Sequence, residues 1–294
     1  MTDKWLEIFL WYSCNLKCKF CFQKDLRFEF KKNLDKDKVI DLLNEWYSNW
    51  KRFIIFSWWE PTLDSNMLYY LEFAKNLWYE DIRIHTNWLT FSSMNLLKKY
   101  VNAWMTWVVI SIHWYSDIHN ILVKNKFAFE KVKKTLLNLV EIKKKKNIVI
   151  DTNTVLNRYN YKNLHKLFKF FSYFPITRSQ IIQLYSLYMF DINEKKNLYV
   201  KYDDFSPYLD EILSLKWVNI TLESFPLCKI KSKHWNNVLK RQKYNNDAFG
   251  YMWEWLEESS CTFLPSCESC SHKDFCIWIP KDYLSIFPKE KFSL

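Results

Sequence analysis

The chain has 294 residues, of which 49% are hydrophobic, so it can build one large α/β domain with a small appendage around a substantial core. It has no apolar run of about 18 residues and no secretory signal at its start, so we expect a cytoplasmic protein without membrane contact. A net charge of +11 permits a nucleic-acid partner, but a generally lysine-rich composition explains this charge more simply. An acidic peptide substrate would be attracted by the same positive charge.

The composition contains one anomaly, which is 1 glycine against 16 tryptophans. Average usage predicts about 7% glycine, roughly twenty residues in a chain of this length. Tryptophan stands where turns call for glycine, as in Ser57-Trp58-Trp59-Glu60-Pro61 and in Asn87-Trp88. We infer that UGA codons, which the organism reads as glycine, are written here as tryptophan. The alternative is a genuinely tryptophan-rich protein that binds carbohydrate or a membrane interface.

Strand-like and helical patterns alternate along the first 200 residues. An apolar strand at 6–10 precedes a cysteine-rich loop, and Asp35 is placed to cap a helix with Val39, Leu42 and Leu43 on one face. The later strands are expected at 53–56, 81–85, 107–112, 148–155 and 180–185, and the later helices at 67–77, 92–100, 129–146 and 163–171. Six such units predict parallel strands joined by crossover helices.

Beyond residue 200 the pattern changes to a helix at 203–215, a short strand at 218–222 and a cysteine-rich tail. We therefore divide the chain into a barrel domain, 1–200, and an extension, 201–294. In barrels of parallel strands, active-site groups lie at the carboxyl ends of the strands. The polar segments at such ends are the cysteine loop, 57–61, 85–87, 111–113 and 153–157. A polar loop containing Asp117 and His119 is expected after the strand at 107–112.

Three cysteines, Cys14, Cys18 and Cys21, share the loop after the first strand. Three thiolates on three irons of a [4Fe–4S] cluster would leave the fourth iron open to a small molecule. Zinc is the competing metal, because three cysteines and a distant fourth ligand would satisfy it, although this x3-x2 spacing is less usual for zinc.

The run Tyr12-Ser13-Cys14-Asn15-Leu16-x-Cys18-x-Phe20-Cys21 resembles the signature of radical S-adenosylmethionine (SAM) enzymes. The resemblance implies an open, TIM-like partial (β/α)6 barrel in which SAM chelates the open iron of the cluster. It also implies that reductive cleavage of SAM yields a 5′-deoxyadenosyl radical, which abstracts hydrogen from a substrate. A ferredoxin- or flavodoxin-type reductant would supply the electron.

The turn after the second strand resembles the Gly-Gly-Glu-Pro motif of this family, with Trp58 and Trp59 at the glycine positions. A backbone without side chains there lets SAM approach closely, and Glu60 offers a carboxylate to the SAM amino group. Indoles at these two positions would obstruct that approach. A solvated turn acid is the plain alternative for Glu60.

Further SAM contacts are implied at the cysteine loop and at the later strand ends. Phe20 would pack on the adenine, and both Ser111 and His113 would hydrogen-bond the ribose or the SAM carboxylate. Asn153 resembles a fifth-strand contact to SAM. Ordinary core packing remains open for Phe20 and His113. Three weaker strand-end candidates also suit turn capping, and they are His85, Asn87 and Asn157.

The tail carries a second cysteine group, Cys267-x2-Cys270-x5-Cys276, which with Cys228 supplies four ligands. It resembles the auxiliary-cluster region of SPASM and twitch extensions. The full SPASM pattern would have another cysteine where this chain has Pro280, which favours a twitch-like extension with a single [4Fe–4S] cluster. Cys261 could replace Cys228, and zinc is the competing metal.

An auxiliary cluster implies, by analogy, modification of a peptide or protein. A tRNA or small metabolite is the alternative substrate within the same class. A different class is a non-catalytic zinc or iron–sulfur protein that binds nucleic acid.

Overall fold

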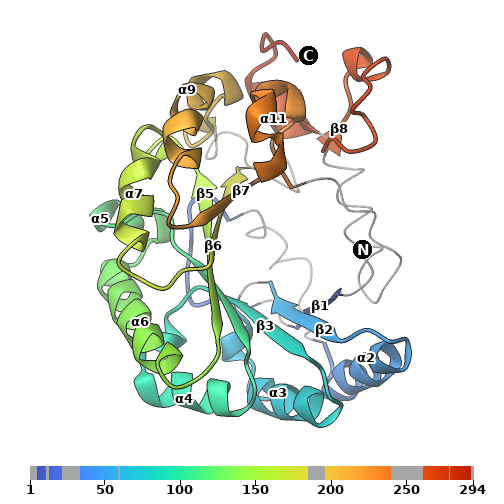
Figure 1. The fold of residues 1–294 in the computed structure, drawn as a ribbon, viewed down its shortest axis with the longest axis vertical. Helices are drawn as coiled ribbons and strands as arrows, with labels where there is room; N and C mark the ends of the chain where they lie inside the picture. Colours follow the sequence, from blue (N-terminus) through green and yellow to red (C-terminus); the bar gives the residue numbers. More distant parts are fainter. Residues whose placement is uncertain are drawn as a thin grey trace.

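A curved sheet of seven parallel strands forms the centre of the molecule. The computed structural model describes residues 5–10, 13–21, 34–58, 60–184, 196–239, 261–277 and 279–292. The strands are hydrogen-bonded in chain order, and they are β1 Trp5–Phe9, β2 Phe53–Ser57, β3 Asp81–Thr86, β4 Trp107–Ser111, β5 Val149–Leu156, β6 Arg178–Gln183 and β7 Asn219–Glu223. The sheet bends into an open arc (Figure 1), which confirms the predicted α/β partial barrel.

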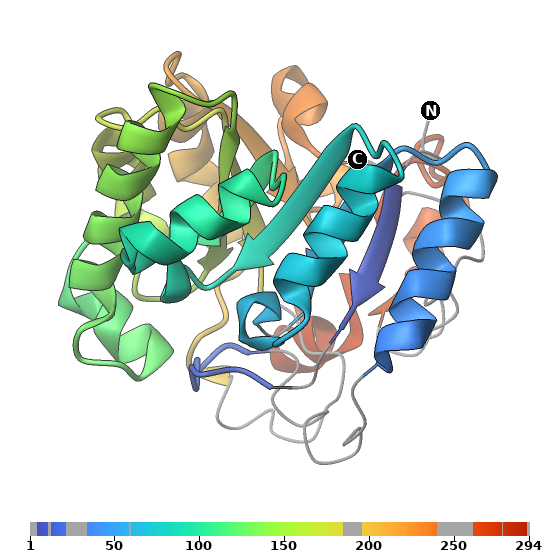
Figure 2. The ribbon, with the colours of Figure 1, turned by 90° about the horizontal axis from the view of Figure 1, so that it is seen from below.

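Helices cover the convex side of this arc (Figures 1 and 2). They are α2 Lys36–Ser48, α3 Met67–Asn76, α4 Met94–Asn102, α5 Asp117–Val123, α6 Ala128–Lys143, α7 Leu164–Phe171 and α9 Tyr202–Leu213. The predicted cap of the first of them is confirmed, because the Asp35 side chain accepts a hydrogen bond from the backbone N–H of Asp37. No described helix is both long enough and apolar enough to cross a membrane.

The two faces of the sheet differ in chemistry because successive side chains on a strand point to opposite faces. In β3, Ile82 and Ile84 are fully buried in the hydrophobic core, while Arg83 alternates with them onto the concave face. In β5, Asp151 has the same inward orientation and receives the Arg178 guanidinium of β6, with Nη2 2.9 Å from Oδ2. The interior of the arc is therefore polar.

The sheet includes one strand beyond the six expected units, because β7 pairs with β6 and places Asn219 beside Arg178. This strand comes from the segment assigned to the extension, and the division at residue 200 stays a prediction. Besides short 3-10 helices, the described residues form the antiparallel strands β8 Cys261–Thr262 and β9 Ile279–Pro280, and helix α11 Lys281–Ile286. The Tyr283 hydroxyl accepts the backbone N–H of Tyr202, 2.8 Å away, and so ties α11 to α9.

The predicted polar loop around Asp117 and His119 is wrong, since these residues lie in helix α5. This helix has only seven residues, too few for a clear apolar period to appear in the sequence. Tertiary contacts stabilise it instead, because Leu122 is fully buried and its carbonyl accepts the backbone N–H of Lys19 at 2.8 Å.

Three helices end on a tryptophan in the left-handed conformation, namely Trp50 (φ 61°), Trp78 (φ 65°) and Trp104 (φ 81°). In each case the tryptophan and the residue after it donate paired hydrogen bonds to the last turn, as Trp50 does to Tyr47 and Lys51 does to Trp46. Glycine is the usual residue at this position because it has no Cβ to clash.

Two further tryptophans have positive φ at strand ends, Trp58 (φ 68°) after β2 and Trp88 (φ 70°) after β3. Together with the three helix ends, they account for five of the seven non-glycine residues with positive φ in the described ranges. The backbone thus uses these tryptophan positions as proteins normally use glycine, which supports the inference drawn from composition.

Candidate active site

The cysteine loop lies across the carboxyl ends of the first strands. Its backbone is held there because the Glu60 N–H donates to the Ser13 carbonyl at 3.2 Å, while the Lys19 N–H bonds helix α5. Leu16 and Phe20 are buried under the loop, and the three thiols remain half-buried. Figure 2 shows this segment at the end of the sheet toward which the strand arrows point.

Asn87, at the end of β3, connects that strand to the loop. Its Nδ2 lies 3.5 Å from the Cys14 sulfur and 2.7 Å from the Asn15 Oδ1. The backbone N–H of Leu16 also points at the Cys14 sulfur, at 3.4 Å. Both donors thus point at a sulfur atom that, as a thiolate, is a metal ligand. From the sequence, Asn87 was one of the weaker candidates for a contact to SAM, and the structure places its side chain against Cys14.

The Glu60 carboxylate is fully buried and bonds four donors of its own protein. One oxygen accepts from the Thr62 N–H (3.2 Å), the Thr62 hydroxyl (2.5 Å) and the Thr86 hydroxyl (2.8 Å). The other oxygen accepts from the Asn87 N–H at 2.6 Å. Burial raises the pKa of Glu60, and these hydrogen bonds oppose the rise. The side chain therefore braces the ends of β2 and β3, and its contact with the SAM amino group stays a prediction.

The tryptophans at these two strand ends fill space next to the loop. The Trp58 ring stacks on Phe9 with centroids 4.3 Å apart, and the Trp88 indole donates from Nε1 to the Ser111 carbonyl at 2.6 Å. Both side chains are buried, so glycine at either position would open a cavity at this rim of the barrel. The expected contact at Trp59 lies outside the described residues.

His113 connects the loop to the fourth and fifth strands. Its ring contacts Phe20 edge-on, with centroids 4.3 Å apart, and its Nδ1 accepts the Val155 N–H at 3.2 Å. Burial, followed by the nearby His119, holds the pKa of His113 well below its usual range. A neutral ring with Nδ1 as acceptor carries its proton on Nε2.

Ser111 and Asn153 are neighbours in the register of β4 and β5. Both side chains are half-buried, and by strand alternation they face the concave side of the sheet. Within the described ranges neither side chain has a hydrogen-bond partner, so both remain available to a ligand. Asn157 is fully buried and caps its own turn by accepting the Tyr159 N–H at 3.0 Å.

His119 is a site residue that sequence reasoning missed. Its Nδ1 accepts the His113 N–H at 3.3 Å, and burial lowers its pKa to about 3. Its Nε2 is buried without a hydrogen-bond partner among the described residues. The signal in the sequence was a second histidine six residues after His113, but its contact depends on helix α5, which the sequence did not reveal.

The four predicted tail ligands line one pocket. Apolar side chains of Leu227, Phe263, Ile277 and Ile279 surround it, and the thiols come from Cys228, Cys267, Cys270 and Cys276. Burial, then the nearby Cys276, raises the pKa of Cys228 to about 11. Cys261 does not line this pocket, because it lies in β8 opposite Pro280.

In neither cysteine group, nor elsewhere in the described ranges, do three Cys, His, Asp or Glu side chains converge closely enough to hold a single metal ion. Four thiols line the tail pocket, and three lie on the cysteine loop. These are the numbers of cysteine donors that a closed and an open [4Fe–4S] cluster take, respectively.

Residues 8–171 match the radical SAM superfamily. This match covers more than half of the chain, which therefore belongs to the radical SAM superfamily and is an enzyme of that class.

The chain is similar to two curated proteins over about half of its length. The S-adenosylmethionine-dependent nucleotide dehydratase of Lacinutrix mariniflava is 26% identical over 160 residues, which are 52% of this chain and 33% of that protein. A Methanocaldococcus jannaschii protein, provisionally named as a glycyl-radical enzyme activating enzyme, is 25% identical over 148 residues, 50% of this chain and 59% of that protein. The chain thus matches a third and somewhat over half of their respective lengths.

Solved structures share the fold at low sequence identity. Streptococcus suis SuiB, bound to its precursor peptide SuiA, has a TM-score of 0.60 at 15% identity, covering 98% of this chain and 73% of SuiB. The enzyme anSMEcpe, with bound AdoMet and a Kp18Cys peptide, has a TM-score of 0.57 at 18% identity, covering 71% of this chain and 59% of its own. These similarities agree with the partial barrel seen here.

Proposed function

We propose that Cys14, Cys18 and Cys21 hold a [4Fe–4S] cluster beside which SAM binds. When bound, the cluster and SAM supply a 5′-deoxyadenosyl radical that takes hydrogen from the substrate. The observation that carries this proposal is the placement of the three thiols on one loop over the carboxyl ends of the barrel strands, with hydrogen-bond donors directed at the Cys14 sulfur.

The surrounding residues would hold SAM and exclude water. The Ser111 hydroxyl and the Asn153 amide supply hydrogen-bonding groups on the concave face, and the neutral His113 supplies an N–H donor from Nε2. Phe20 supplies an apolar surface beside Cys21. The Glu60 Oε2 accepts one hydrogen bond, from the Asn87 N–H, and can accept a second from the SAM amino group. The backbone of the turn at 57–61 would also contact SAM, which requires glycine at 58 and 59.

We further propose a second [4Fe–4S] cluster held by Cys228, Cys267, Cys270 and Cys276. Their shared pocket supports it, and four thiolates would leave no open iron. Such a cluster has no site for SAM and would serve to bind substrate or relay an electron. An external ferredoxin- or flavodoxin-type protein would supply electrons to the enzyme.

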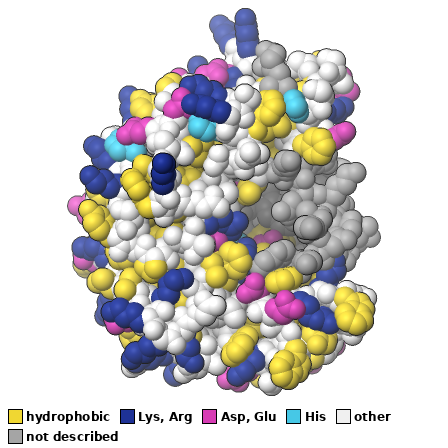
Figure 3. All heavy atoms as spheres, in the orientation of Figure 1, with side chains coloured by type: hydrophobic (Ala, Val, Ile, Leu, Met, Phe, Trp, Pro, Cys, Tyr) yellow, Lys and Arg dark blue, Asp and Glu magenta, His cyan; other side chains and the backbone are white. Residues whose placement is uncertain are grey.

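The proposed substrate is a peptide or protein. The basis is the fold shared with two enzymes, SuiB and anSMEcpe, whose structures contain bound peptides. A nucleic-acid substrate has less support, because Lys and Arg are spread over the face in Figure 3 instead of forming one basic patch.

The test is anaerobic reconstitution of a protein with glycine at all sixteen tryptophan positions, followed by SAM and dithionite and an assay for 5′-deoxyadenosine. We expect product, and we expect Cys18→Ala to abolish it by removing one cluster ligand. A protein that binds zinc instead of iron and leaves SAM intact, with or without added peptide, would favour a non-catalytic binding function.

A further inference from the structure

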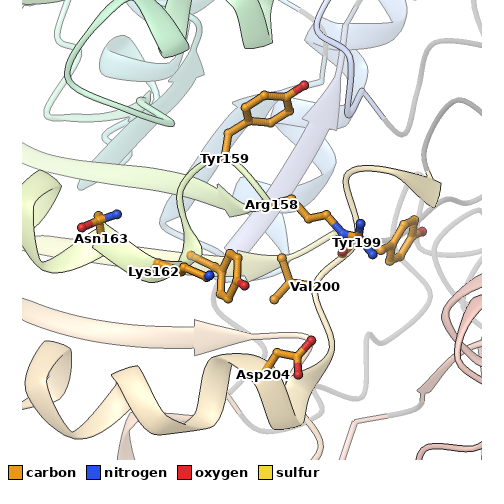
Figure 4. A pocket seen from close by; sticks show the side chains of 8 residues that line it. Arg158, Tyr159, Lys162, Asn163, Tyr199, Val200 and Asp204 are labelled. Atoms are coloured by element: carbon orange, nitrogen blue, oxygen red, sulfur yellow. Dashed lines mark hydrogen bonds between the residues drawn. The ribbon is translucent and has the colours of Figure 1, made fainter.

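A surface pocket of about 360 Å³ opens at the carboxyl end of β5, and no cysteine is among the described residues that line it. One wall is the turn that follows β5, and the other is the segment that enters α9 (Figure 4). The first wall contributes Arg158, Tyr159, Tyr161, Lys162 and Asn163, and the second contributes Tyr199, Val200 and Asp204.

The two walls are fixed to each other. The Arg158 N–H donates to the Leu198 carbonyl and its Nε donates to the Tyr199 carbonyl, both at 3.0 Å. The Tyr161 ring also packs edge-on against Tyr208 of α9, with centroids 5.8 Å apart. The pocket is thus a built feature of the fold. Arg158 is oriented by its Nε, and among the described residues its two terminal nitrogens have no hydrogen-bond partner and can contact a ligand.

The pocket carries an excess of positive charge. Arg158 and Lys162 belong to one wall, and Asp204 is placed on the other (Figure 4). In the described part of the chain, neither cation forms an ion pair. A guanidinium with free terminal nitrogens matches the two oxygens of a carboxylate, and a neighbouring ammonium adds charge.

The pocket lies on the same rim as the cysteine loop. The Asn160 side chain belongs to the turn after β5 but does not line the pocket, and it donates to the His113 carbonyl at 3.0 Å. His113 in turn contacts Phe20 next to Cys21. The Lys19 ammonium lies 5.8 Å from the centre of the Tyr159 ring. The wall and the cysteine loop therefore meet directly at Tyr159 and Lys19, so a few residues of extended peptide, at about 3.3–3.6 Å each, are enough to lead from the pocket to the loop.

We propose that this pocket docks an acidic side chain of the peptide substrate on Arg158 and Lys162, so that the adjoining residues run toward the cysteine loop. The proposal rests on the peptide substrate proposed above. The occupant is specified by charge, since two cations face one acid in the pocket and the whole chain carries +11.

The test measures peptide binding without turnover, by calorimetric titration of the reconstituted protein with acetyl-Ala-Glu-Ala-Glu-Ala-amide and with the same peptide containing glutamine. We expect the glutamate peptide to bind more tightly. Arg158→Gln should weaken its binding about tenfold or more by removing a charge-assisted, two-pronged contact. Asp204→Asn should strengthen it several-fold, because a like charge is removed.

Lys146→Gln is the matched control, since it removes one exposed positive charge at the opposite end of β5. Binding equal for the two peptides, or weakened as much by Lys146→Gln as by Arg158→Gln, would overturn the docking proposal. Weaker binding in Asp204→Asn would do so as well, because it would indicate a cationic ligand. Because binding is read without SAM cleavage, a protein that docks the peptide but forms no 5′-deoxyadenosine would separate this proposal from the proposed function.

Discussion

At the scale of single residues, left-handed backbone angles mark the tryptophan positions at which glycine is the expected residue. An ordinary residue in the left-handed conformation costs roughly 1–2 kcal/mol, and a side chain can repay this only through its contacts. The side chains of Trp50 and Trp78 are 84% and 78% exposed, so they gain little from packing. A protein selected to carry tryptophan would not place it at three helix ends that call for glycine.

The first prediction concerns the mass of the protein made by its own organism. Peptides that contain residues 50, 78, 88 and 104 are expected to carry glycine, each lighter by one indole-bearing side chain, as digestion and mass spectrometry would show. Measured masses that match tryptophan at these positions would refute the UGA inference.

The second prediction concerns the sequence as printed. Trp78→Gly should raise the free energy of unfolding by about 1 kcal/mol, because glycine relieves the left-handed strain. Urea denaturation measures this. Trp217→Gly is the control: its side chain is 51% exposed, but its φ is not positive, so no gain is expected there. Equal gains in both variants would mean that removal of an exposed indole, and not the backbone, is responsible.

The third prediction separates a bracing role for Glu60 from a ligand role. Glu60→Gln replaces one acceptor oxygen by a donor that faces N–H and O–H groups, and it should lower the free energy of unfolding by about 2 kcal/mol without SAM present. Glu141→Gln, on an exposed pair with Lys144, should change it by less than about 1 kcal/mol. An unchanged stability in Glu60→Gln would show that the carboxylate is reserved for a ligand.

At the level of helices and strands, local sequence was sufficient for regular elements and insufficient for contacts between them. The predicted strand at 81–85 agrees with the observed β3 Asp81–Thr86 to within one residue. The prediction succeeded because apolar residues alternate along this segment, which is typical of a strand. Helix α5 escaped prediction because seven residues show no period. The orientation of Glu60 also escaped, since its partners Thr86 and Asn87 belong to another strand end.

The fourth prediction concerns helix α5, which buries His119 in neutral form. Its folded pKa of about 3 lies below the ordinary value of 6.5, so the unfolded chain binds a proton first as pH falls. The stabilisation is complete above pH 6.5 and declines toward pH 3. His119→Asn keeps an acceptor for the His113 N–H but does not titrate.

Between pH 7 and pH 5, the parent should lose about 1–2 kcal/mol more than His119→Asn does, as urea titrations at both pH values would show. The buried carboxyls have raised pKa values, which favour the folded state as pH falls and so oppose the effect of His119. They are present in both proteins, so the difference between parent and variant reports His119 alone. Identical losses in parent and variant would mean that His119 is accessible to protons in the folded state.

Across the whole molecule, the two cysteine groups lie at different places along the sheet. The first lies over the ends of β1 to β3, and the second follows β7, at the other edge of the arc (Figure 1). Sequence spacing identified both groups, but only the fold shows that Cys228 joins the tail pocket and Cys261 does not. No local pattern could have made that distinction, because Cys228 and Cys267 are far apart in the chain.

The fifth prediction is that the two clusters can be removed separately. The reconstituted glycine form should contain about eight irons and eight sulfides per chain, and the double variant Cys267→Ala, Cys270→Ala should contain about four of each. Cys261→Ala is the matched control and should retain about eight, because Cys261 lies outside the pocket. Elemental analysis and sulfide assay would measure both. Loss of about one zinc with iron unchanged would instead establish a zinc site in the tail, and an equal loss of iron in Cys261→Ala would place that residue among the ligands.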